Sequence, residues 1–454
     1  MTHTKEMSPG VIAGLAAILI VYLLLGVGFA IRTPPWQAPD EPAHYNYIAQ
    51  IAENGCCPVI EPGDWDQAYL DTLRANKFAP SLLDDLDRVQ YEDHQPPLYY
   101  LLGAPVYSLT GGSLTALRLL SVVIGVGVVA CAFATGRVVA PARPQIALAA
   151  AALVAFLPQH VAILASVNND GLSELVVGLA LWLSLRYLSG ENVSAWLLGV
   201  LAGVGLLVKV NTIFLAGLVP LVIVLRWWLS RRDGLAVASL PRTLVAFALP
   251  ALALAGVWWA RNISVYGWPD FLGLGAHDAV VVGQLRTAEL LAEVGAGEYL
   301  RRALATTFNS FWGQFGWMAL PLQPWMYTLL ALFLVAAVLG LLLHAALLRR
   351  DARSGQKALW WILALTILLA VAQYIYYNTE FVQFQGRYLY PALIPMALYL
   401  ALGLDAWRRL IVRATDGQPG ANGPLRWLAP SVVSALVALD IYILWRVIPG
   451  LLPA

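Results

Sequence analysis

Acidic and imidazole side chains follow the first long apolar segment of the chain. Asp40, Glu41 and His44 lie within QAPDEPAHYNYIAQIAENG, residues 37–55. A carboxylate at this point could act as a general base, because it can accept the proton of a hydroxyl that attacks a substrate. The same stretch also suits a capped amphipathic helix, since Pro42 is favoured in a first helical turn. Spacing alone leaves the catalytic and the helix-capping interpretation open.

Further polar side chains lie at the ends of apolar segments or inside them. His94 precedes two prolines in YEDHQPPLYYLLG, and Asp170 lies in a turn within SVNNDGLSEL. Each such residue has a structural interpretation, as a helix cap or as a cation that reaches the lipid headgroups. Charge inside a bilayer is costly unless it has a function, so the set together predicts a polar pocket suited to a phosphate-bearing lipid and a polar acceptor. Its candidate members are Asp40, Glu41, His44, His94, Asn169, Asp170, Lys209, Arg261 and Arg387.

The elements that must position these residues are membrane-spanning helices. The chain has 454 residues, of which 59% are hydrophobic and only 12% are charged, whereas soluble domains average about 25% charged residues. The net charge of +1 argues against a nucleic-acid partner, because such a protein needs a basic surface to neutralise phosphates. Three cysteines are too few for a disulfide framework or a zinc site. The composition predicts an all-α polytopic membrane protein.

Apolar segments of spanning or near-spanning length predict about eleven transmembrane helices, within a range of about ten to thirteen. The first has no small-residue cleavage site after it, so we expect an uncleaved anchor. Residues 98–110 are expected to form a helix on the membrane surface, because a crossing there would misplace the basic connections that follow. The expected spans lie near 11–31, 119–139, 145–166, 171–188, 195–210, 212–229, 243–260, 326–348, 358–377, 388–407 and 427–445.

Arg and Lys residues gather in four connections between these spans. Basic connections face the cytoplasm, so we expect a cytoplasmic N-terminus and a multi-pass protein of the inner or plasma membrane. Two long segments, 32–117 and 261–325, then face outward, and the first should carry amphipathic surface helices. We expect residues 1–454 to form one transmembrane domain with no separate soluble domain. The basic connections are 136–145, 226–243, 348–357 and 408–426.

The order of these motifs resembles the GT-C superfamily of membrane glycosyltransferases. Within it, the chain is most similar to protein O-mannosyltransferases, aminoarabinose transferases and a related bacterial family. The resemblance covers nearly the whole chain, and its most specific parts are the Asp-Glu pair after the first span and the His-x-Pro-Pro segment. The matching strings are PDEPAHYNYI, HQPPLYYLL, RLLSVVIG, LPQHV with SVNNDGL, LLVKVNTIFL, WWARN, SFWGQFGWM and QGRYLYPAL.

This resemblance implies an inverting transfer of a sugar from a polyprenyl-phosphate donor to an acceptor hydroxyl on the outer face. Asp40 matches the first-loop aspartate of the family and is the expected general base. His94 matches a position that binds the carrier phosphate, where some relatives have lysine. The expected catalytic residues are Asp40, Glu41 and Asp170. The expected substrate-binding residues are His44, His94, Asn169, Lys209, Arg261 and Arg387.

The resemblance implies no cofactor, and we predict no metal, although a divalent ion is allowed. The oligosaccharyltransferase branch, which uses one, is disfavoured because its large soluble C-terminal domain has no counterpart here. Two alternatives stay open. One is a transporter or flippase of lipid-linked sugars, for which Glu174, Lys209 and Asp440 inside apolar segments would be relevant. The other is a polysaccharide polymerase or ligase with diphosphate-linked donors. The acceptor could be a protein, a glycolipid or a polysaccharide.

Overall fold

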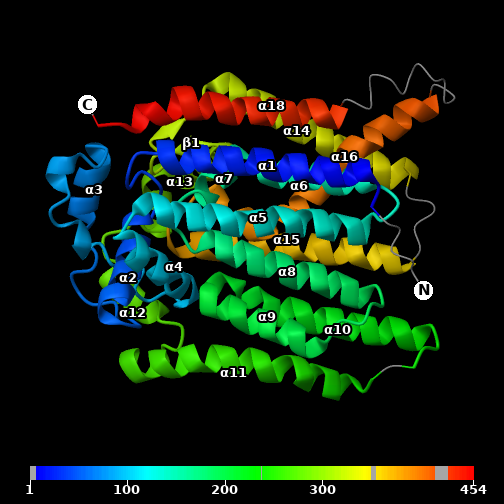
Figure 1. Ribbon diagram of the computed structural model, residues 1–454, viewed down its shortest axis with the longest axis horizontal. Coiled ribbons are helices and arrows are strands. Elements are labelled where there is room, and N and C mark those ends of the chain that lie inside the picture. The colour runs from blue at the N-terminus through cyan, green and yellow to red at the C-terminus, as the bar shows by residue number, and fades with distance from the viewer. Residues whose placement is uncertain (1–6, 237, 349–353, 415–427, 454) are drawn as a thin grey trace.

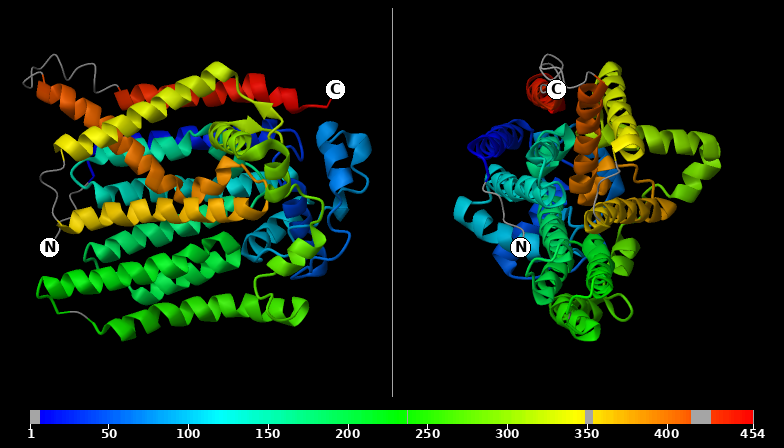
Figure 2. Two further views of the ribbon diagram at one scale, coloured as in Figure 1. Left: turned by 180° about the vertical axis from the view of Figure 1, so that it is seen from behind. Right: turned by 90° about the vertical axis from the view of Figure 1, so that its right-hand side faces the viewer.

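The chain folds into a bundle of long helices that run side by side (Figures 1 and 2). The computed structural model describes residues 7–236, 238–348, 354–414 and 428–453. In this part of the chain the only strands are β1 (Gln314–Phe315) and β2 (Leu320–Pro321), which form a two-residue antiparallel ladder. The predicted all-α polytopic fold is therefore confirmed.

Nine helices of the described residues are long and apolar enough to cross a membrane. A tenth span is formed if α6 (Pro144–Ala155) and α7 (Pro158–Leu164), bent by 66° at their junction, count as one. The helix α9 (Ala195–Val208) is apolar but shorter, with 14 residues. Nine or ten candidate spans are found among the described residues, and the expected number of about eleven is roughly within range. The first residues of α1 (Pro9–Arg32) and the last residues of α18 (Leu428–Tyr442) lie at opposite ends of the bundle (Figure 1), as an odd number of crossings requires.

The helices of the bundle and the short helical turns that continue them have these bounds: α1 Pro9–Arg32, α5 Leu114–Val139, α6 Pro144–Ala155, α7 Pro158–Leu164, α8 Asp170–Leu188, α9 Ala195–Val208, η3 Val210–Phe214, α10 Leu215–Arg232, α11 Leu240–Tyr266, α13 Thr287–Trp312, α14 Pro324–Leu343, η4 His344–Leu348, α15 Ser354–Glu380, η6 Gly386–Ala392, α16 Leu393–Ala414, α18 Leu428–Tyr442, η7 Ile443–Val447 and η8 Ile448–Leu451.

Short helices gather at one end of the bundle, at the left of Figure 1, where α1 leads into α2. Among them, α4 is 13 residues long and does not qualify as a span, in agreement with the surface helix expected for residues 98–110. We call this the Asp40 end, and the expectation that it faces outward stays a prediction. The short helices are α2 Glu41–Asn54, α3 Gln67–Ala75, η1 Pro80–Leu82, η2 Leu86–Arg88, α4 Leu98–Thr110 and α12 Leu274–Val280.

Small residues allow close packing between the spans. A Cβ atom at Gly199 of α9 would lie 2.0 Å from the carbonyl oxygen of Phe247 in α11, so these two backbones touch. Such contacts are the usual way in which helices associate in a membrane, where apolar side chains gain little from leaving lipid. At the Asp40 end, the adjacent Cys56 and Cys57 are joined by a disulfide.

Two of the four predicted basic connections lie partly outside the described residues. The connections at 349–353 and 415–427, with Arg349, Arg350, Arg353 and Arg426, lie outside the described residues. The connections near 136–145 and 226–236 are described, and both lie at the end of the bundle away from Asp40 (Figure 1). The described basic connections therefore share one end.

Candidate active site

A buried ion pair fixes the start of α2. Glu41 is fully buried, and its carboxylate oxygens accept hydrogen bonds from Arg118 Nε at 2.7 Å and Nη2 at 2.6 Å. The backbone N–H groups of Trp36 and Val167 donate to the same carboxylate at 3.1 and 3.2 Å. A two-point contact between arginine and carboxylate is strong and fixes orientation. Glu41 thus joins α2 to α5 and to the connection between α7 and α8.

The same arginine also binds the end of α1. Arg118 donates to the carbonyl oxygens of Ala30, Thr33 and Pro34 at 3.1, 2.6 and 3.1 Å. The last carbonyls of a helix have no partners within that helix, so Arg118 satisfies groups that burial would otherwise leave unpaired. The first span, α2 and α5 are therefore held in a fixed relation directly beside Asp40.

These contacts do not support the catalytic role expected for Glu41. Each of its oxygens already accepts two hydrogen bonds in a fully buried position, which leaves no room for a substrate hydroxyl. We infer that Glu41 positions its neighbour. The sequence analysis missed Arg118, because an arginine next to the apolar segment 119–139 looks like a boundary residue. The string RLLSVVIG, which begins with it, was the available signal.

Asp40 has a different conformation from an ordinary helix cap. Its φ of 64° and ψ of −1° lie in the left-handed region, which aspartate tolerates better than most residues. Its side chain makes no capping hydrogen bond to α2. Instead, Oδ1 accepts from the Tyr91 hydroxyl at 2.8 Å, and Oδ2 is bound by the Arg387 guanidinium. The helix-capping interpretation of this side chain is therefore wrong.

Arg387 links Asp40 to a second carboxylate. Its other terminal nitrogen, Nη1, lies 3.7 Å from Oδ2 of Asp170, the first residue of α8. Lys209, at the break between α9 and η3, pairs with Oδ1 of the same Asp170. We call Asp40, Arg387, Asp170 and Lys209 the charge array. It alternates in sign from one member to the next, and it draws on segments far apart in the sequence.

The array keeps Asp40 ionised. Burial alone would raise the pKa of the Asp40 carboxyl, but the charge and hydrogen bond of Arg387 outweigh it. With a smaller contribution from the Tyr91 hydrogen bond, the pKa falls to about 2. Asp40 is therefore a carboxylate throughout the physiological range, and in this state it is a weak base.

The two histidines near the array are neutral. His44 Nδ1 lies 2.9 Å from the Tyr100 hydroxyl, and His94 Nδ1 lies 3.1 Å from the carbonyl oxygen of Tyr91, to which it donates. Burial lowers the pKa of His44, and burial lowers that of His94 to about 4. His277 lies beside His94, with ring centroids 4.3 Å apart. His94 is therefore not the cation that the phosphate-binding expectation requires.

Arg261 is engaged elsewhere at this end of the bundle. Its guanidinium donates to the carbonyl oxygens of Cys57 and Pro58 and to the Tyr266 hydroxyl. Among the described residues, no hydrogen bond or ion pair joins Arg261 to His94 or to Arg387. The expected meeting of these three is thus not supported, and only Arg387 contacts Asp40.

Unpartnered polar atoms lie beside the array. The Asn169 amide donates to the Tyr100 hydroxyl at 3.3 Å, while its Oδ1 is buried and has no hydrogen-bond partner in the described structure. The same holds for Oε2 of Glu92. Burial raises the pKa of the Glu92 carboxyl. Buried polar atoms are rarely left unpaired, so these two are candidate hydrogen-bond partners for a ligand. The sequence analysis missed Glu92, although it stands in the string YEDH.

No group of three or more His, Cys, Asp or Glu side chains is arranged to hold a metal ion in the described part of the chain. The cations that neutralise carboxylates at this site are instead side chains, Arg387 and Lys209. The expectation that no metal takes part stays a prediction.

Comparison with known proteins gives one family match and several similar structures. Residues 94–259 match the family model described as dolichyl-phosphate-mannose-protein mannosyltransferase. No curated protein matches the chain. The apo oligosaccharyltransferase of Archaeoglobus fulgidus is 15% identical, and the match covers 99% of this chain and 56% of that one, with a TM-score of 0.50.

Two further structures were solved with lipid phosphates. ArnT from Cupriavidus metallidurans, bound to undecaprenyl phosphate, is 14% identical with a TM-score of 0.48, over 98% of this chain and 74% of that chain. The Archaeoglobus fulgidus oligosaccharyltransferase AglB, with an inhibitory peptide and dolichol-phosphate, is 16% identical with a TM-score of 0.48, over 96% and 55%.

The family match confirms the expected resemblance to GT-C membrane glycosyltransferases and, with it, the class of enzyme. It spans His94, Arg118, Asp170 and Lys209. Asp40 and Arg387 lie outside the matched residues, so their roles rest on the geometry described above.

We expect Glu41→Gln to destabilise the protein far more than the loss of an exposed ion pair. Removing one partner of a buried pair leaves the other charge unpaired and costs about 3–5 kcal/mol. The matched control is Asp85→Asn, whose Arg88 partner lies 3.3 Å away on an exposed surface and whose loss should change little. Thermal unfolding of both variants in the same lipid nanodiscs would measure the difference. Equal unfolding temperatures would contradict the structural role of Glu41.

We expect His94 to make the protein less stable in mild acid. Its pKa in the folded state, about 4, lies below the ordinary value of about 6.5, so the unfolded chain binds the proton more readily. Its stabilising contribution is present above about pH 6.5 and is lost as the pH falls toward 4. Between pH 7 and pH 5, the unfolding temperature should therefore fall less in His94→Gln than in the wild type. A variant that loses as much or more would indicate that His94 is charged in the fold.

Proposed function

We propose that the chain transfers a sugar from a polyprenyl-phosphate-linked donor to an acceptor hydroxyl on the outer face of the inner membrane, with inversion and with Asp40 as the general base. The observation that carries this proposal is the charge array at the Asp40 end of the bundle. It combines an ionised carboxylate with two cations at the height where a lipid headgroup would lie. Inverting transfer needs both, a base for the acceptor and positive charge for the departing phosphate.

Arg387 and Lys209 are the groups best placed to receive the donor phosphate. Arginine pairs two phosphate oxygens at once and stays charged, while lysine acts as a compact point charge. Both cations are desolvated, with Arg387 buried and Lys209 mostly buried. Charge on the leaving phosphate would develop against cations that Asp40 and Asp170 hold in position before the donor binds. Such preorganised charge is a main source of catalysis.

Donor binding would also activate the base. Asp40 with a pKa of about 2 is too weakly basic for efficient proton transfer, which works best when the pKa is near the operating pH. A phosphate that takes Arg387 from Asp40 removes the charge that depresses this pKa, while burial continues to raise it. Asp40 then becomes a stronger base only when the donor is in place, and Tyr91 still holds its other oxygen.

The neutral groups beside the array suit a sugar. His44 and Asn169 share the Tyr100 hydroxyl as a neighbour, and the free Oδ1 of Asn169 is a hydrogen-bond acceptor. Uncharged donors and acceptors of this kind recognise hydroxyl groups without competing with the phosphate for charge. We assign the two residues to the sugar or the acceptor.

The flippase alternative loses support from the pairing of the charges that kept it open. Lys209 belongs to the array, and Oε2 of Glu174 lies 2.8 Å from Nε2 of His160 in a buried pair. Of the three, Asp440 alone is buried with both oxygens lacking a hydrogen-bond partner among the described residues. A single acid on the last span is a narrow basis for a transport path.

The test is Asp40→Asn, which keeps the shape of the side chain and removes its charge. Loss of a general base should lower kcat about 100-fold or more. Binding of the donor should persist or tighten, because Arg387 is released from its carboxylate. The assay follows release of polyprenyl phosphate from polyprenyl-phosphate mannose in nanodiscs supplied with membrane-extract acceptors. The control is Asp85→Asn on the exposed loop, which should keep full activity. Turnover near the wild-type rate in Asp40→Asn would disprove the mechanism.

A further inference from the structure

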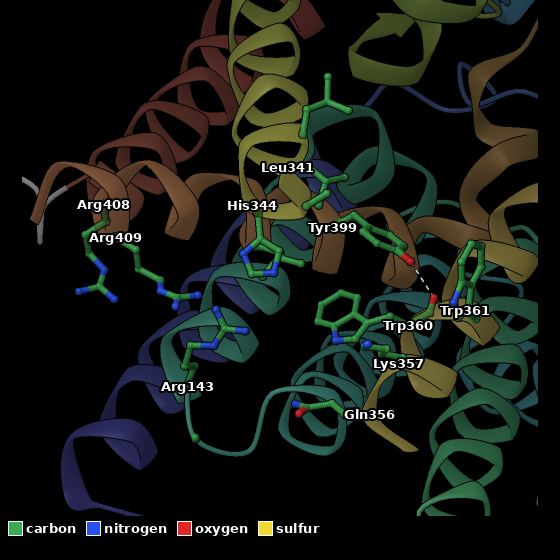
Figure 3. A pocket seen from close by; sticks show the side chains of 14 residues that line it. Arg143, Leu341, His344, Gln356, Lys357, Trp360, Trp361, Tyr399, Arg408 and Arg409 are labelled. Carbon is green, nitrogen blue, oxygen red and sulfur yellow. Dashed lines mark hydrogen bonds between the residues drawn. The ribbon is translucent and has the colours of Figure 1, made fainter. Parts of the chain in front are cut away.

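A large basic cavity lies at the end of the bundle opposite to Asp40. Its volume is about 780 Å³, and it is lined by the last turn of α14 with the start of η4, the start of α15, residues 399–409 of α16 and the connection between α5 and α6 (Figure 3). None of the residues assigned above to the charge array contributes to it. The cavity is therefore a separate feature from the candidate active site.

The walls of this cavity are strongly positive. Four cations line it, Arg143, Lys357, Arg408 and Arg409, and none of the described residues lining it is acidic. Among the described residues, the carboxylate of Asp405 accepts from Arg143 at 3.0 Å and from Arg408 at 2.9 Å. Asp405 thus balances part of the charge of the four cations. An anionic ligand would relieve the mutual repulsion of these cations.

Aromatic side chains set the depth of the cavity relative to the membrane. Trp360 and Tyr399 pack with ring centroids 5.2 Å apart, and the Tyr399 hydroxyl donates to the Trp360 carbonyl at 2.6 Å. Trp361 next to them is 64% exposed, and Figure 3 shows it on the same side of the cavity. Tryptophan and tyrosine concentrate where hydrocarbon meets headgroups. The cations therefore lie at headgroup level, at the ends of three candidate spans.

The cavity has a rigid wall and an apolar neighbour. Gly340 of α14 and Gly403 of α16 touch, since a Cβ on Gly340 would lie 2.2 Å from the Gly403 carbonyl oxygen, so the two helices cannot close further above it. Arg408 also lines a second cavity of about 310 Å³. That cavity is mainly apolar, with Ile18 and Val433 in its walls. The basic cavity is suited to the anionic headgroup of a lipid, and the apolar cavity next to it is suited to the acyl chains.

We propose that the basic cavity binds the phosphodiester headgroup of an anionic glycerolipid, in the leaflet opposite to Asp40. Basic pockets between transmembrane helices are suited to such headgroups. The apolar neighbour and the exposed tryptophan favour a lipid over a soluble phosphate compound. This site is independent of the proposed sugar transfer, because it uses other residues at the other end of the bundle.

The test measures binding of dihexanoyl-phosphatidylglycerol to the purified full-length protein in neutral detergent. The variant is Lys357→Gln with Arg409→Gln, which leaves Arg143 and Arg408 in place to hold Asp405. Each cation removed should weaken binding about five-fold, and the pair about 25-fold. The control is Arg231→Gln, which removes a cation from the same end of the bundle, where it stacks on Trp227 away from the cavity. This control should bind as the wild type does.

Two further probes separate the sources of the phosphate. Dihexanoyl-phosphatidylcholine should bind much more weakly, because its headgroup has no net charge. Inorganic phosphate at millimolar concentration should not displace the glycerolipid. Displacement would identify a free-phosphate site, and equal weakening in Arg231→Gln would identify general surface attraction. Either result, or no binding of phosphatidylglycerol, would overturn the proposal.

Discussion

The buried contact between Glu41 and Arg118 determines the geometry at the Asp40 end of the bundle. One guanidinium binds the carbonyls that end α1 and the carboxylate that starts α2, so the chain must turn sharply between these two helices. Asp40 stands in that turn with a left-handed backbone, and its side chain is directed away from α2 toward Arg387. The two adjacent acids therefore have different tasks: Glu41 holds the scaffold, and Asp40 is presented to the charge array.

Burying charge next to a membrane is expensive, and the array limits the cost by alternating its signs. Arg387 lies between Asp40 and Asp170, and Asp170 lies between Arg387 and Lys209. A ligand with negative charge can enter such an array by exchange, because each cation it takes releases a carboxylate. In our account this exchange is what couples donor binding to the basicity of Asp40. Burial raises the pKa of the Asp40 carboxyl, and the charge of Arg387 lowers it. When Arg387 leaves, only the effect of burial remains and the pKa rises.

Much of the fold follows from the sequence, because hydropathy over about 20 residues decides whether a helix can span a membrane. The distribution of arginines argued against a span at 98–110, and α4 is too short to qualify as one. The place of Asp40 after the first span made it a candidate site residue. Partners were harder to predict. Arg118 and Glu41 are 77 residues apart, and nothing local indicates that they meet. The charge of His94 depends on burial against Tyr91 and His277. Arg261 was expected at the phosphate but holds the backbone at Cys57 and Pro58, a contact that only tertiary structure creates.

The exchange of Arg387 between Asp40 and the donor phosphate is the central claim, and a structure with a bound polyprenyl phosphate tests it most directly. Our account predicts that the phosphate contacts Arg387 and Lys209, that Asp40 Oδ2 has lost its guanidinium partner, and that Tyr91 still binds Oδ1. A phosphate bound at His94 or Arg261, with the pair between Asp40 and Arg387 intact, would contradict it.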